Sequence, residues 1–160
     1  MNKRIIADGI AAQLRGVRAG IQAHYKSRDQ ASKEAPGAMQ SRYDTSRFEE
    51  SRVAEATGKR LRDLDEIIRA VEYVSRRPPV EYGAVGSVVH VREEKNELFF
   101  LILPPGGGGV CFEDKKSGIT YQAVSTESPI GRALLGKSKG DTAVFTVPAG
   151  KRTFEILDVG

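Results

Sequence analysis

The sequence predicts an α+β protein in which an N-terminal antiparallel two-helix coiled coil, residues 1–75, precedes an antiparallel sheet with one short helix, residues 80–160. Apolar residues recur at steps of three and four in two long segments before residue 75, which is typical of coiled-coil helices. Apolar and polar residues alternate in short segments after residue 80, which is typical of strands. Pro78 and Pro79 cannot continue a helix, so residues 76–79 are the predicted linker.

The first predicted helix covers residues 2–33. Its coiled-coil face is formed by the apolar residues Ile10, Leu14, Val17 and Ile21, followed by His24 or Tyr25. Glycine inside a helix costs about 1 kcal/mol relative to alanine, and this helix holds Gly9, Gly16 and Gly20. We therefore expect it to need a partner helix.

The second predicted helix covers residues 46–74 and supplies that partner. The residues on its coiled-coil face are Val53, Thr57, Leu61, Leu64, Ile68 and Val71. Its start is indicated by Ser46 and Glu49, which have capping-box spacing, and a competing start lies one turn earlier at Ser41. Pro36 and Gly37 end the first helix. Two antiparallel helices of about 30 residues form a hairpin about 45 Å long.

The bend of this hairpin, residues 34–50, is rich in carboxylates. Glu34, Asp44, Glu49 and Glu50 all lie there, far from the rest of the chain. Negative side chains at a helix start are stabilised by the helix dipole, so they could serve only to cap or decorate the helix. The alternative is chemistry performed at the tip. The spacing alone leaves both interpretations open.

In the second half, strands are expected at residues 85–91, 97–103, 110–112, 119–124, 143–147 and 152–157. One short helix lies between them, with Ser128 as its N-cap, Pro129 at its first position and Gly136 at its C-terminal end. The residues expected to face the sheet are Ile130, Ala133, Leu134 and Leu135.

Composition narrows the class of protein. The 160 residues are 39% hydrophobic and 29% charged, as in soluble folded proteins, and no apolar run approaches the roughly 20 residues of a membrane span. The N-terminus has no apolar signal-peptide core. The lone cysteine, Cys111, allows no internal disulfide and is flanked by apolar residues, so we expect it to be buried. A cytoplasmic protein is therefore expected.

Positive charge is concentrated in the helical half. Residues 1–77 hold sixteen Lys or Arg and eleven Asp or Glu, whereas residues 78–160 hold nine and ten. Arg15, Arg18, Gln22 and Lys26 follow one another at steps of three and four, so they form a polar stripe on one face of the first helix. This stripe could contact nucleic acid or an acidic protein surface, or it could be a solvated helix face.

The chain shows no self-contained catalytic centre. The run Gly106–Gly109 lacks the following Lys-Ser/Thr and helix of a phosphate loop, so a turn between strands is expected. His24 and His90 lie in different halves, and no cysteine or second histidine stands at zinc-ligand spacing. No histidine is placed to suggest a catalytic triad.

Several C-terminal motifs identify a family resemblance. The segments Ser128–Lys137, Gly140-Asp141, Pro148–Lys151 and Phe154–Leu157 closely resemble the C-terminal signature of the GreA/GreB transcript-cleavage factors. The hairpin matches that family in length, order and position. Leu103–Gly108 and Arg42–Thr45 resemble a divergent Gre-like branch more than the main cleavage factors.

The resemblance implies an FKBP-like C-terminal domain that docks on the rim of the secondary channel of RNA polymerase. The coiled coil then passes down that channel to the active centre. On this basis Ser128, Pro129 and Ile130 are the expected polymerase-binding residues. Arg15, Arg18 and Lys26 are the expected nucleic-acid-facing residues, with nascent RNA as a second contact.

The resemblance also implies that acidic tip residues help to hold a second Mg²⁺ in the polymerase, because two hard cations stabilise the attacking and leaving oxygens of phosphodiester hydrolysis. The candidates are Asp44, then Glu49 and Glu34, acting in trans, with Asp44 as the shared Mg²⁺ ligand. The cleavage factors carry an Asp-Leu-x-Glu-Asn-Ala type motif at this place, followed by Glu-Tyr. Here residues 41–46 read Ser-Arg-Tyr-Asp-Thr-Ser, and arginines flank the aspartate.

The expected function is binding to RNA polymerase and modulation of elongation, including stimulated cleavage of backtracked RNA. The chain is not expected to be an enzyme; at most it stimulates the polymerase's own RNA cleavage. No tightly bound cofactor, membrane or small-molecule substrate is expected. The alternatives are a non-cleaving channel regulator or inhibitor, a peptidyl-prolyl isomerase suggested by the FKBP-like shape, and a structural coiled-coil adaptor. The absence of tryptophan argues against the isomerase.

Overall fold

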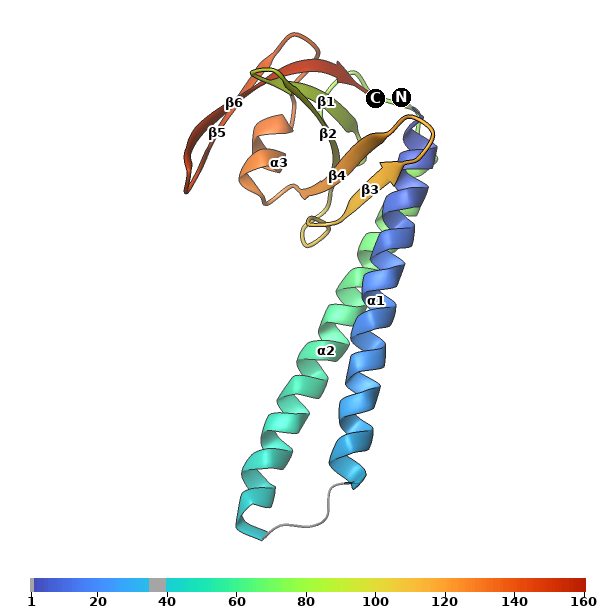
Figure 1. Ribbon diagram of the computed structural model, residues 1–160, viewed down its shortest axis with the longest axis vertical. Coiled ribbons are helices and arrows are strands. Elements are labelled where there is room, and N and C mark those ends of the chain that lie inside the picture. Colours follow the sequence, from blue (N-terminus) through green and yellow to red (C-terminus); the bar gives the residue numbers. More distant parts are fainter. Residues whose placement is uncertain (1, 35–39) are drawn as a thin grey trace.

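In the computed structural model, the described backbone covers residues 2–34 and 40–160, and the side chains of 29, 31–48 and 50 lie outside the described part. Two long helices, α1 (Lys3–Glu34) and α2 (Gln40–Ser75), run antiparallel as a hairpin that projects from a sheet domain (Figure 1). The predicted α+β fold class is thereby confirmed. No helix among the described residues combines the length and apolarity required to cross a membrane.

The boundaries of the hairpin differ from the prediction at one end. Helix α1 ends at Glu34, before Pro36, as expected, but α2 begins at Gln40. The predicted start at Ser46 is therefore wrong, and the competing start near Ser41 is close to the structure. Because no glycine or proline occurs between residues 39 and 57, the helix continues through the Ser-x-x-Glu pattern. Residues 35–39 lie outside the described part.

The sheet has six strands in the order β3-β4-β2-β1-β6-β5. The strands are β1 (Val88–Glu93), β2 (Asn96–Leu103), β3 (Cys111–Asp114), β4 (Ile119–Ser125), β5 (Thr142–Val147) and β6 (Gly150–Val159). Four neighbouring pairs are antiparallel, but β2 and β4 are parallel, with Leu101 opposite Ala123. The sheet is mixed rather than wholly antiparallel. After β2 the chain skips the neighbouring position and forms β3 one strand further out. It then returns as β4 between β2 and β3, parallel to β2.

The short helix α3 (Pro129–Leu134) forms as predicted. Ser128 is its N-cap, and Gly136 follows it with a φ of 72°, which favours glycine. Leu134 is fully buried, whereas Leu135 is 38% exposed, so the expectation that Leu135 faces the sheet is wrong. Leu135 is the C-cap residue, and its extended backbone turns it off the helix face.

Two apolar clusters cover the two faces of the sheet. One cluster joins the hairpin base to the sheet and contains Ile6, Ala7, Ile10, Ala11, Leu14, Leu64, Ile67, Ile68, Val71, Val88, Leu101, Leu103, Tyr121 and Ala123. The other lies beside α3 and contains Val89, Val91, Phe100, Ile102, Val124, Leu134, Ala143, Phe145, Phe154 and Ile156. The sheet therefore holds the base of the hairpin. Helix α2 ends at Ser75, but the division into domains at residues 76–79 stays a prediction.

The buried coiled-coil face is shorter than predicted. Ile10 and Leu14 are buried as expected, but Val17 is 41% exposed and Val53 is 40% exposed. Gly9 belongs to the buried section, because a Cβ added there would lie 2.3 Å from the Phe112 ring. Glycine at this position thus lets β3 pack directly on α1.

Cys111 is exposed, so the expectation that it is buried is wrong. It begins the edge strand β3, in which Phe112 packs toward the hairpin and its neighbours face outward. The Gly106–Gly109 segment is a turn between β2 and β3, as predicted, with a φ of 80° at Gly106. A Cβ at Gly107 would lie 3.1 Å from Ile67, so the turn packs closely on α2.

Candidate functional site

The first candidate surface is the corner where α3 begins. The Ser128 hydroxyl donates to the Ser125 carbonyl oxygen at 2.7 Å, and its oxygen accepts the Gly131 N–H at 3.0 Å. Pro129 is exposed, whereas Ile130 is partly buried and packs on the cluster beside α3. Of the three predicted docking residues, Pro129 is thus the most available to a partner, and Ser128 holds the corner in place.

The α3 corner also requires Gly131, which is not among the docking residues predicted from the sequence. A Cβ there would lie 2.0 Å from the Ser125 carbonyl oxygen, which is backbone and has little freedom to move. The signal was its place in the Ser-Pro-Ile-Gly-Arg motif, directly after the predicted docking residues.

The second candidate surface is the polar stripe of α1. The Arg18 guanidinium forms two hydrogen bonds with the Asp65 carboxylate, at 2.6 and 3.0 Å, and a third with Gln22 at 3.1 Å. Arg15 forms an ion pair with Glu72. Hydrogen bonding to Arg18 lowers the pKa of the Asp65 carboxyl. These two arginines therefore have partners inside the hairpin, and their nucleic-acid-facing role stays a prediction.

Lys26, the last basic residue of the stripe, is exposed and lies nearer the tip. The sequence pattern did not point to the acidic partners of Arg15 and Arg18. Asp65 and Glu72 stand seven residues apart on α2, which places them two turns apart on one face of that helix, where Glu72 pairs with Arg15 and Asp65 with Arg18.

The third candidate surface is the hairpin tip, at the end farthest from the sheet (Figure 1). Glu34 is the last residue of α1, and Glu49 is an exposed residue of α2. Asp44 lies inside α2, so the expectation that it stands before the second helix is wrong. The side chains of Glu34 and Asp44 lie outside the described part, and which carboxylate faces a metal stays a prediction.

A metal site formed by this chain alone finds no support in the described residues. Among them, no group of three histidine, cysteine, aspartate or glutamate side chains is arranged to hold an ion. Mg²⁺ needs several oxygen ligands in near-octahedral geometry, and one exposed carboxylate on a helix does not provide them.

These observations define a class of protein: a long helical hairpin fixed at its base on a small mixed sheet, with one capped helix at a sheet corner. Residues 112–160 match the family model described as "Transcription elongation factor, GreA/GreB, C-term". This match confirms, for residues 112–160, the resemblance to GreA/GreB factors seen in the sequence motifs.

Curated relatives named transcription elongation factor GreA agree with this match. The relative from Halorhodospira halophila is 31% identical over 112 residues, which are 70% of this chain and 63% of the relative. The relative from Acidiphilium cryptum is 31% identical over 104 residues, 62% of this chain and 60% of the relative. The chain thus matches about 60% of the length of these relatives.

Solved structures similar to this chain include Thermus aquaticus Gfh1. That structure is 22% identical, has a TM-score of 0.40, and the match covers 94% of this chain and 90% of that one. A GreA/GreB factor from Nitrosomonas europaea is 26% identical with a TM-score of 0.38, over 52% of this chain and 64% of that one.

Proposed function

We propose that this chain binds bacterial RNA polymerase at its secondary channel and modulates transcription elongation. The observation that carries the proposal is the joining of a GreA/GreB C-terminal domain to a projecting hairpin. The fully buried residues of α1 end at Leu14, and Glu34 lies twenty residues further along the helix. At 1.5 Å per residue, about 30 Å of hairpin therefore extends beyond the buried section, which suits insertion into a channel.

In this proposal the sheet domain docks on the rim of the channel, and the corner of α3 makes the contact. Pro129 is the exposed residue of that corner, and Ser128 fixes its orientation through two hydrogen bonds. Pro129→Asp removes an apolar contact and adds a charge without touching the buried Leu134. We expect this variant to keep its fold and to lose affinity for core polymerase. If the folded variant binds core polymerase with unchanged affinity, the α3 corner is not part of the interface.

The tip would then lie beside the polymerase's active centre, where the polymerase's own Mg²⁺ supplies the Lewis-acid chemistry of RNA cleavage. This chain would act only in trans, through Asp44, with Glu49 and Glu34 as the next candidates. Each could offer oxygen ligands and position water near the RNA.

A second candidate function is that of a regulator that occupies the channel without stimulating cleavage. It is favoured by the start of α2 at Gln40, because Asp44 then lies inside a helix with Arg47 three positions further on. Residues at this spacing are neighbours on a helix surface, so the arginine can compete with Mg²⁺ for the carboxylate.

A backtracked elongation complex separates the two functions. If the tip supports cleavage, the wild-type protein accelerates release of short 3′ RNA fragments, and Asp44→Ala abolishes this effect while binding to core polymerase is retained. If the wild-type protein binds the complex and releases no fragments, the cleavage function is excluded and the channel regulator is supported. If it does not bind core polymerase at all, both functions fail.

A further inference from the structure

A hollow of about 480 Å³ lies at the base of the hairpin, away from the docking corner and the tip. Its lining residues come from the start of α1, the end of α2 and the chain that follows it, and the C-terminal end of the chain. The two ends of the chain lie side by side in Figure 1. The lining of the hollow consists of Asn2, Lys3, Arg4, Ser75, Arg77, Pro79 and Gly160. Its volume is in the range of ordinary small-ligand pockets.

The lining is strongly cationic. Lys3 and Arg4 come from the first turn of α1, and Arg77 comes from just beyond α2. Among the described residues, neither Lys3 nor Arg77 forms an ion pair with a carboxylate, and Arg4 reaches only Asp8, at 4.0 Å on the surface. Three cationic residues thus line the hollow, and no aspartate or glutamate is among its lining residues.

These positive charges lie close enough to act on one another. The pKa of Lys3 is lowered, first by burial of its amino group and second by the charge of Arg77. Cations that converge without an anionic partner destabilise the folded chain, and a bound anion would relieve that repulsion.

The backbone adds to this positive field. Helix α1 has 32 residues and no acidic side chain in its first turn, so no negative side chain offsets the positive end of its dipole there, although Asn2 Oδ1 accepts the Ile5 N–H at 3.4 Å. Arg77 is also held in position. Its guanidinium lies 5.4 Å from the centre of the Tyr73 ring, and its backbone N–H donates to the Val74 carbonyl oxygen at 3.2 Å. A preorganised arginine loses little entropy on binding an anion.

We propose that this hollow binds a small phosphorylated ligand with at least two phosphate groups, such as pyrophosphate or a nucleoside di- or triphosphate. Arginine suits phosphate because its planar fork donates two parallel hydrogen bonds, and Lys3 and Arg4 add charge for a second phosphate. The start of α1 adds a favourable dipole. This proposal does not depend on polymerase binding.

The test uses the full-length chain and pyrophosphate, titrated by calorimetry at constant ionic strength, with inorganic phosphate as a second probe. We expect pyrophosphate to bind more tightly than phosphate, and Arg77→Gln to weaken it by about tenfold, as expected for loss of a charged hydrogen-bond donor. Arg76→Gln is the matched control, because Arg76 is the exposed neighbour in the chain and does not line the hollow. We expect this control to bind within about twofold of the wild type.

Lys3→Gln supplies a second variant in case Arg77→Gln perturbs the end of α2, and circular dichroism checks that both are folded. Loss of pyrophosphate binding in either folded variant supports the proposal. Equal weakening by Arg76→Gln would overturn it, because the effect would then be one of net charge. Binding of tetraglutamate in preference to pyrophosphate would also overturn it and would make the hollow a contact for an acidic protein segment. Failure of the wild type to bind pyrophosphate rejects the proposal outright.

Discussion

Single glycines show how closely individual positions are fixed. A Cβ at Gly131 would lie 2.0 Å from the Ser125 carbonyl oxygen, whereas a Cβ at Gly20, on the outer part of α1, would meet nothing within 4 Å. The same residue type thus serves close packing at the α3 corner and has no packing role on the outer hairpin.

Alanine substitution at these two glycines should therefore act in opposite directions. Gly131→Ala should destabilise the protein by about 1–3 kcal/mol, because the backbone must move to relieve the overlap. Gly20→Ala should stabilise it by about 0.5–1 kcal/mol, because alanine is the better helix residue. Urea unfolding of both variants measures the difference. A stabilised Gly131→Ala protein would contradict the close approach of Gly131 to the Ser125 carbonyl oxygen.

At the scale of elements, ion pairs join the two helices alongside their buried apolar contacts. Arg15 pairs with Glu72 and Arg18 with Asp65, and Val17, between these arginines on α1, is exposed. The base of the hairpin is thus held by buried apolar contacts and, on the polar face beside them, by two charge pairs.

The Arg18–Asp65 pair predicts a pH dependence. The folded pKa of Asp65 lies below its ordinary value of 3.8, first because Arg18 donates a hydrogen bond to it. A depressed folded pKa stabilises the folded state above pH 3.8, and that contribution is lost as the pH falls through the lowered folded pKa. Asp65→Asn should therefore show a smaller loss of stability than the wild type as the pH falls below about 4. Titration of the Asp65 carboxyl by NMR checks the cause. An ordinary pKa would contradict the pairing.

Periodicity in the sequence predicted the two helices and the six strands, because burial imposes a repeat on each of these elements. It did not predict the parallel pairing of β2 with β4, since a buried strand has the same pattern in either direction. The predicted start of α2 at Ser46 was wrong, because the Ser-x-x-Glu pattern also occurs inside helices and does not by itself mark a helix start. Val17 and Cys111 are exposed because of where the partner helix and the edge of the sheet lie. The spacing of apolar residues in the sequence does not specify those positions.

At the scale of the whole molecule, the basic residues of the helical half have different environments. Arg15 and Arg18 are paired with acidic residues of α2, and Lys26 is exposed nearer the tip. If the stripe faces RNA or polymerase, Lys26 is the residue of the three that can do so without breaking the hairpin's own ion pairs.

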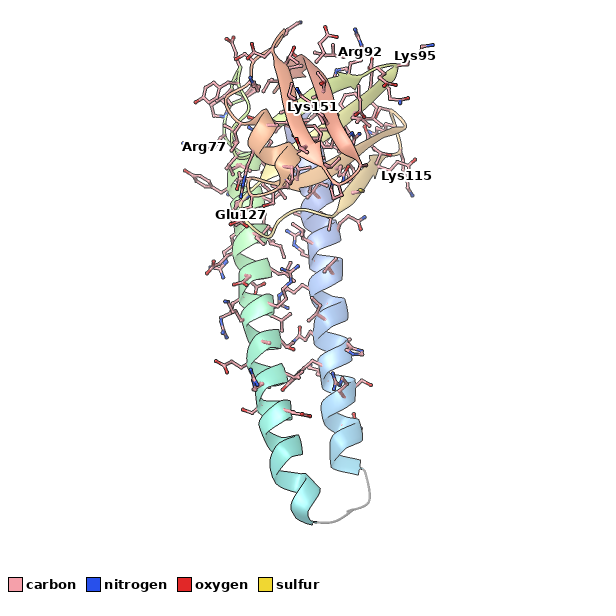
Figure 2. All side chains as sticks on the ribbon, turned by 90° about the vertical axis from the view of Figure 1, so that its left-hand side faces the viewer. Arg77, Arg92, Lys95, Lys115, Glu127 and Lys151 are labelled. Carbon is pink, nitrogen blue, oxygen red and sulfur yellow. The ribbon has the colours of Figure 1, made fainter. Side chains whose placement is uncertain are left out.

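Lys26→Glu should therefore weaken association with an elongation complex, and the weakening should shrink as salt is raised, because the contact is electrostatic. Lys115→Glu is the matched control, since Lys115 is also exposed but lies in the sheet domain (Figure 2). Association is measured by titration at two salt concentrations. Equal effects of the two substitutions would indicate that the stripe is an ordinary solvated helix face that contacts neither RNA nor polymerase.

In the proposed function, the hairpin tip reaches the active centre of the polymerase. Cys111 is the single cysteine and is exposed, so Cys111→Ser gives a chain in which Glu49→Cys or Lys115→Cys can carry a photo-crosslinker. Both positions are exposed, one near the tip and one in the sheet domain. In a backtracked elongation complex with a labelled RNA 3′ end, we predict a cross-link to RNA from position 49 and none from position 115. A cross-link from position 115 alone, or none from position 49 in a complex that retains the protein, would contradict the account.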